Sequence, residues 1–296
     1  MKKITEFSKL RKAQDNELIY QINKFAEDIK ASLKELPILL KNGLIIDGEF
    51  SKINEVPFTP FYLDIEYNPN VYDENVDKFL NDITCNHKEL RKTLEEILGH
   101  ILLTNKFPAH VFFLAGGGNN GKSTFLDCVK AILGDRNISA LDLKELWDSF
   151  NTSMMFGKLA NIGDDIGDDF LRGSQVSVFK KIVTGNRIKA ERKGQDPFEF
   201  NPFIKLLFSA NDIPRMKDKT GAVLRRLVII PFNATFSKDD PDYRPFIKYE
   251  LTQQDSIEYL IRLGVEGLKR VVINNGFSKS DKVQNQLLSL IHISEP

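Results

Sequence analysis

The stretch Gly116–Thr124 has the types and spacing that bind a phosphate chain, because its first eight residues satisfy the pattern G-x-x-x-x-G-K-[ST]. They lie between the apolar run Val111–Ala115, which predicts a buried strand, and Phe125–Leu133, which predicts a helix. In that setting loop N–H groups bind phosphate, Lys122 reaches the β- and γ-phosphates, and Ser123 ligates Mg²⁺. The residues predicted to bind ATP are Gly116, Gly117, Gly118, Asn119, Asn120, Gly121, Lys122, Ser123 and Thr124.

Two adjacent carboxylates, Asp164 and Asp165, end the apolar stretch that begins at Lys158. At the carboxyl end of a strand they lie at the edge where open α/β sheets bind ligands. One carboxylate can hold Mg²⁺ and the other can orient or deprotonate the attacking water. We assign Asp164 to the metal and Asp165 to the water, although the sequence leaves their order open. A solvated acidic loop is the alternative interpretation, which the preceding phosphate loop disfavours.

Polar residues also mark the two strands predicted further along the chain. Asn211 ends the strand 203–211, where its amide can donate to the γ-phosphate and hold the attacking water. A turn asparagine is the alternative interpretation. Arg225 and Arg226 precede the strand 227–230. In a monomer they are surface charge, whereas in a ring NTPase one arginine would reach the neighbouring subunit's γ-phosphate.

A cation-rich turn lies between two β-prone flanks within residues 187–200. Its cations Lys189, Arg192 and Lys193 could follow a nucleic-acid backbone, each displacing a counterion. A solvated hairpin tip is an equally good interpretation of the same residues. The turn therefore gives a candidate DNA-binding site that needs support from elsewhere.

The composition of the 296 residues is that of a globular protein, with 42% hydrophobic and 28% charged residues. The 41 basic and 41 acidic residues cancel, so a nucleic-acid contact would have to be a local patch. Only two cysteines occur, which excludes a disulfide framework and indicates a reducing cytoplasm. No apolar run reaches transmembrane length and the start lacks a signal-peptide core, so we expect no membrane contact.

The hydrophobic pattern divides the chain into five parts. Residues 1–41 are predicted to be a helical N-terminal segment, and 42–105 a small, mainly helical accessory domain with a turn near residue 47. Residues 106–235 alternate strands and helices, which predicts an α/β core with a mainly parallel sheet. Residues 236–287 form a C-terminal helical segment, with a helix at 254–273. The end, 288–296, is interpreted as sequencing-adapter read-through, which implies a truncated gene.

With these residues in view, the chain resembles superfamily 3 helicases, in particular the helicase half of phage and plasmid primase-helicases. Motifs corresponding to Walker A (116–124), Walker B (159–165), the B′ segment (179–193), motif C (206–211) and the Arg-Arg-strand ending (225–232) occur in order. The likeness covers roughly residues 40–275. One departure is Asn186, where the family usually has aspartate after glycine.

The resemblance implies a P-loop NTPase of modified AAA+ type, assembled as a homo-hexameric ring with ATP and Mg²⁺ bound between subunits. It implies that Arg226 is the arginine finger and that Lys193 lies at the tip of a hairpin in the central channel. The implied function is an ATP-dependent DNA helicase that moves on single-stranded DNA during phage or plasmid replication. Such a protein acts in the bacterial host cytoplasm, with a separate primase as a partner.

Two other functions fit parts of the sequence. The first is an ATP-binding scaffold that assembles on origin DNA without unwinding it, which the Asn186 departure and the zero net charge favour. The second is another P-loop DNA motor, such as a packaging motor. The strand that ends at Asn211 and the Arg225–Arg226 pair argue against that motor. We therefore take the helicase as the main hypothesis.

Overall fold

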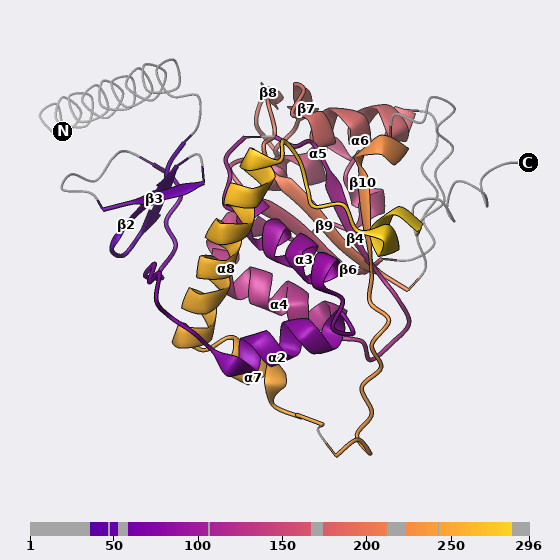
Figure 1. Ribbon diagram of the computed structural model, residues 1–296. Coiled ribbons are helices and arrows are strands. Elements are labelled where there is room, and N and C mark those ends of the chain that lie inside the picture. The colour runs from indigo at the N-terminus through magenta and orange to yellow at the C-terminus, as the bar shows by residue number, and fades with distance from the viewer. Residues whose placement is uncertain are drawn as a thin grey trace, which may run out of the picture. The chain divides into compact units, whose positions relative to one another are not determined.

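Residues 37–296 form one compact unit in the computed structural model, and residues 1–36 form another (Figure 1). The predictions for the N-terminal helices before residue 36 and for the 288–296 tail lie outside the described residues. The structure describes residues 36–46, 48–52, 59–105, 107–166, 174–211, 223–241 and 243–285.

A five-stranded parallel sheet is the centre of the fold, in the order β10-β4-β9-β6-β5. This confirms the predicted α/β class, and each strand predicted in the core is present. The strand that ends before Asn211 lies between the strand before the phosphate loop and the strand of the two carboxylates. The strands are β4 (Val111–Ala115), β5 (Ile138–Ser139), β6 (Ala160–Ile166), β9 (Lys205–Ala210) and β10 (Leu227–Pro231).

Both faces of this sheet are covered, which explains why its central strands are continuous apolar runs. All five residues of β4 are buried. Since side chains alternate along a strand, Val111 and Phe113 pack on one face with Phe179 and Ile182 of α6, while Phe112 faces the other way. Figure 1 shows α3, α4 and α8 covering that other face. The α-helices are α2 (Glu74–Ile83), α3 (Lys88–His100), α4 (Lys122–Leu133), α5 (Ser149–Thr152), α6 (Ser174–Thr184), α7 (Ile247–Leu251) and α8 (Gln254–Ile273).

Short elements complete the described part of the chain. The cation-rich turn is the tip of an antiparallel hairpin, as predicted, and it follows α6. Four 3-10 turns connect the larger elements. The hairpin is β7 (Ile188–Ala190) with β8 (Phe198–Phe200), and the 3-10 turns are η1 (Asp135–Asn137), η2 (Leu143–Glu145), η3 (Ser153–Met155) and η4 (Leu224–Arg226).

The region ahead of the core is only partly helical. An antiparallel sheet of β1 (Ile38–Leu40), β2 (Gly43–Ile46) and β3 (Glu49–Ser51) precedes α2. The turn predicted near residue 47 lies between the paired strands β2 and β3. The helical prediction for 1–41 is wrong at β1, and β3 gives no signal of its own, because it is short and one of its three residues is apolar. Residues 37–105 belong to the same compact unit as the core, and the domain boundary at 105 stays a prediction.

Helices α3 and α8 pack closely because glycines meet where they cross. A Cβ atom on Gly99 would lie 2.2 Å from the carbonyl oxygen of Gly264. An ion pair also joins the two helices, because Arg270 of α8 lies 2.6 Å from Glu95 of α3. Within α3, Glu95 also accepts from Arg91 at 3.0 Å. The C-terminal helix is thus fixed to the region that precedes the core.

We expect Gly264→Ala to destabilise the protein, although alanine favours an isolated helix by about 1 kcal/mol. The added methyl group would press on the backbone of Leu98 at 2.9 Å, and overpacking of this kind costs about 1–3 kcal/mol. Thermal unfolding of Gly264→Ala beside Lys269→Ala, an exposed position on the same helix, measures the effect. A melting temperature equal to or above that of the control would contradict the close packing.

Candidate nucleotide site

The phosphate loop connects β4 directly to α4, as its sequence predicts. Gly121, the residue before α4, has a φ of +87° and lies so close to α2 that a Cβ atom would be 2.5 Å from Ile83. A Cβ atom on Gly116 would lie 2.3 Å from the carbonyl oxygen of Phe232. Glycine is therefore required at both ends of the loop for steric reasons. The loop is enclosed by α2 and by the segment after β10.

Lys122 points back into the loop that precedes it. Its side chain is 7% exposed, and its ammonium group donates to the carbonyl oxygens of Gly116 and Gly117, the latter at 2.9 Å. A third acceptor is Oδ1 of Asn120 at 3.2 Å. The loop therefore holds a positive charge at its mouth, where phosphate oxygens could replace these acceptors.

The two asparagines of the loop connect it to the chain after β10. The side chain of Asn120 is buried, and its Nδ2 donates to the carbonyl oxygens of Gly117 and Phe232, the latter at 3.1 Å. The carbonyl oxygen of Asn119 accepts from the N–H of Phe236 at 2.8 Å. The side chain of Asn120 thus faces the interior and bonds within the protein, so its backbone N–H is the group of this residue that could donate to a phosphate.

Asp164 lies beside two hydroxyl groups. Its Oδ1 accepts from Ser123 at 3.3 Å and from Ser209 of β9 at 2.5 Å. A bulge in β6 contributes to this arrangement: Gly163 pairs with Phe208 and Ile166 with Ala210, so two residues face Ser209. The backbone of Asp165 belongs to the same strand end, while its side chain is outside the described atoms.

These oxygens fit a magnesium ion, which prefers carboxylate and hydroxyl ligands and keeps several waters or phosphate oxygens. The hydroxyl of Ser123 and the carboxylate of Asp164 are already within hydrogen-bonding distance, so one ion could contact both. Among the described residues there is no cluster of three or more His, Cys, Asp or Glu side chains that could hold a metal by itself. An ion held by Ser123 and Asp164 would have further positions open to phosphate oxygens and water.

Asn211 and Arg226 lie at opposite ends of the strands: Asn211 at the carboxyl end of β9 and Arg226 at the amino end of β10. Asn211 follows Ala210, which pairs with Ala115, so it lies at the edge where the phosphate loop begins. Arg226 precedes Leu227, which pairs with Val111 at the start of β4. The length of β4 separates this arginine from the loop by about 16 Å, at roughly 3.3 Å per residue. Its position excludes a direct contact with a phosphate bound to its own loop.

The cations of the β7–β8 hairpin have different surroundings. Lys189 pairs with Glu191 at 2.8 Å, and the Arg192 guanidinium lies 5.0 Å from the centre of the Phe198 ring. Lys193 is exposed in the turn. Phe198 and Phe200 bound the turn in the sequence, but sequence inspection missed Phe156, which is 47% exposed and contacts Phe198 with ring centres 5.4 Å apart.

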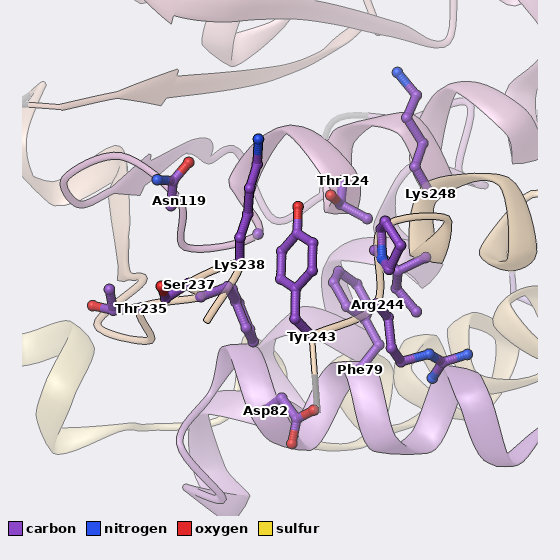
Figure 2. Close-up of a pocket in the computed structure, with 14 residues that line it drawn as sticks. Phe79, Asp82, Asn119, Thr124, Thr235, Ser237, Lys238, Tyr243, Arg244 and Lys248 are labelled. Carbon is purple, nitrogen blue, oxygen red and sulfur yellow. The ribbon is translucent and has the colours of Figure 1, made fainter. Parts of the chain in front are cut away.

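A pocket of about 750 Å³ opens beside the loop and receives residues from α2, α4 and the segment after β10 (Figure 2). Figure 2 shows the Tyr243 ring between Thr124 and the α2 residues Phe79 and Asp82. An aromatic wall next to a phosphate loop suits a nucleobase. No local sequence pattern indicates this pocket, because the residues of its walls are far apart along the chain. Its lining includes Phe79, Asp82, Asn119, Thr124, Phe236, Lys238, Tyr243, Arg244 and Lys248.

Cysteine chemistry plays no part in this site. Burial raises the pKa of Cys128 in α4 to about 12, so its thiol remains protonated at neutral pH. The other cysteine, Cys85, is exposed in the turn after α2. The chemistry available here is therefore that of a lysine, a carboxylate, hydroxyls and backbone N–H groups.

The chain is similar to a family of unknown function and to two viral proteins that are named as helicases. Residues 114–226 match a family model described as a family of unknown function, DUF5906. Over 267 residues the chain is 26% identical to Putative helicase 121R of Invertebrate iridescent virus 3, covering 80% of this chain and 28% of that protein. It is also 26% identical over 185 residues to Putative helicase L207/L206 of Acanthamoeba polyphaga mimivirus, covering 60% of this chain and 19% of the relative.

The fold resembles a solved structure, "The apo structure of NrS-1 C terminal region (305-718)", with a TM-score of 0.61. The match covers 79% of this chain and 54% of that one at 15% identity, so it supports the fold alone. The chain spans less than a third of the length of these two viral relatives. In the part of the chain that the structure describes, no helix is both long and apolar enough to cross a membrane.

Removing the Asn120 amide should loosen the loop. We expect Asn120→Ala to lower the free energy of unfolding by about 1–3 kcal/mol, because the buried carbonyl of Phe232 would lose its side-chain donor. Chemical denaturation beside Asn233→Ala, an exposed asparagine nearby, measures the difference. Equal stability of the two variants would show that the amide does not hold the loop.

Proposed function

We propose that this chain is the motor of an ATP-dependent DNA helicase related to superfamily 3. One observation carries the proposal: the phosphate loop, Asp164 and Asn211 all lie at the carboxyl edge of adjacent parallel strands. Similarity to two viral proteins named as helicases supports the choice of reaction. The nucleoside of ATP would enter the pocket beside the loop, with its base against Tyr243.

Each residue at this edge has a role that its position supports. Lys122 binds the β- and γ-phosphates in place of its loop acceptors, and the loop N–H groups bind their oxygens. Ser123 and Asp164 hold Mg²⁺, which neutralises phosphate charge when bound. Asp165 orients the attacking water, and Asn211 holds the γ-phosphate and that water. Ser209, which donates to Asp164, fixes the direction of the carboxylate.

Hydrolysis would need a second subunit. Arg226 lies at the sheet edge opposite its own phosphate loop, so its guanidinium could stabilise a γ-phosphate only in a neighbouring chain. A homo-hexameric ring with ATP between subunits satisfies this requirement. The site of each subunit would then be completed by the arginine of the next.

The β7–β8 hairpin is the proposed contact with single-stranded DNA. Its tip carries Lys193, and Arg192 and Phe198 lie beside the partly exposed Phe156. Cations that follow a backbone and aromatic rings that stack on bases are the two components of sequence-independent strand binding. The sequence left DNA contact and a solvated tip as equal interpretations, and the aromatic neighbours favour DNA contact.

The first test is ATP hydrolysis by the full chain with and without single-stranded DNA, with Lys122→Ala as the blank. We expect turnover that DNA stimulates and that the blank lacks. ATP turnover that DNA leaves unchanged would favour the origin-binding scaffold over the helicase, and strand displacement would then be absent as well.

Mixing two inactive variants tests the shared site. We expect Lys122→Ala and Arg226→Ala each to abolish turnover, and their mixture to recover part of it. In mixed rings some interfaces combine an intact loop from one chain with an intact arginine from the other. Recovery is measured as ATPase activity against mixing ratio, with mixed assembly verified by differently tagged subunits. No recovery in verified mixtures would exclude an arginine supplied by the neighbour.

Substitutions in the hairpin test the DNA surface. Lys193→Ala should weaken single-stranded DNA binding and reduce the salt dependence by about one counterion, because one phosphate contact is lost. Phe156→Ala should cost about 1–3 kcal/mol through lost base stacking, with little change in salt dependence. Binding titrations at several salt concentrations, beside the exposed control Lys144→Ala, separate the two effects. Affinities equal to the control would place the DNA elsewhere.

A further inference from the structure

A second lysine approaches the phosphate loop from the C-terminal part of the chain. Lys248 is the second residue of the short helix α7, and its ammonium group lies 2.7 Å from Oδ2 of Asp127 in α4. The side chain is 67% exposed, so this ion pair holds an otherwise solvated cation in one place. Nothing in the sequence pattern singles out this residue.

The ion pair positions Lys248 on the phosphate side of α4. Asp127 is four residues after Ser123 and three after Thr124, so it lies on the helix face that carries both hydroxyls. Lys248 also lines the pocket together with Asn119 and Thr124. The hydrogen bond to Asp127 is the main cause that raises the pKa of Lys248. The negative charge of Asp164, the proposed metal ligand, also raises this pKa by electrostatic attraction.

Charge is unevenly distributed within the pocket. Figure 2 shows Asp82 together with Arg244 at one end, where their charges balance, and Lys238 and Lys248 extending away from that end. A nucleotide with its base near Phe79 and Tyr243 would direct its phosphates toward the lysines and the loop. The two ends of the pocket are thus complementary to the two ends of a nucleoside triphosphate.

We propose that Lys248 is a second phosphate-binding lysine, which exchanges Asp127 for an oxygen of the bound triphosphate. This inference rests on the proposed ATP site. The exchange leaves Asp127 paired, because its Oδ1 already accepts from Lys130 at 3.2 Å.

The test compares Lys248→Met with Lys130→Met, which removes the other cation of Asp127 but does not line the pocket. Affinities for ATP with Mg²⁺ and for adenosine are measured by displacement of a fluorescent ATP analogue. We expect Lys248→Met to weaken ATP binding about tenfold, or ~1.4 kcal/mol, with adenosine unchanged. Lys130→Met should stay within about twofold of wild type, and Lys248→Arg should recover most of the ATP affinity.

The controls separate failure of this inference from failure of the site itself. ATP affinity of Lys248→Met equal to that of Lys130→Met, or an equal loss for ATP and adenosine, would overturn the role of Lys248. A wild-type signal no greater than that of Lys122→Ala would instead overturn the nucleotide site. Thermal unfolding of each variant identifies any general loss of folding. If Lys248→Met is unfolded, the ATP affinity of Lys248→Arg is compared with that of Lys130→Met instead.

Discussion

The site depends on the parallel alignment of three strands. In β4, β9 and β6 the last residues pair in register, with Ala210 opposite both Ala115 and Ile166. Strands aligned in this way all end on one side of the sheet, about 4.8 Å apart. The phosphate loop, Asn211 and the carboxylates are therefore neighbours, although Asn211 comes 95 residues after Gly116 in the sequence. Any change in register would separate them.

Much of this arrangement could be predicted because its strands are buried on both faces. Val111–Ala115 and Leu227–Pro231 are continuous apolar runs between turn residues, and α8 shows clear helical periodicity over Gln254–Ile273. Each of these signals is local, because the residues that form it are consecutive or nearly so in the sequence. The strands β1 and β3 were missed because three residues give too little pattern, and their stability comes from pairing with β2.

The contacts between distant segments could not be predicted. Ser209 looks like any strand residue, and only the bulge in β6 brings Asp164 against it. The pocket is similar in this respect, since Phe79, Thr124 and Tyr243 come from three segments that meet only in the folded chain. Sequence motifs identify the groups that we propose to contact phosphate. They carry little information about the groups that support those residues or surround the rest of a ligand.

The contact between α2 and the phosphate loop has a practical consequence for anyone who shortens this protein. A fragment that starts at residue 106 would keep every motif residue from Gly116 to Arg226. It would lose Ile83 and Phe79, which enclose Gly121, and Glu95, which neutralises Arg270 of α8. The C-terminal helix would then have an unpaired arginine and an uncovered apolar face. Inactivity of such a fragment would follow from the missing wall of the pocket, so it would not test the proposed catalytic residues.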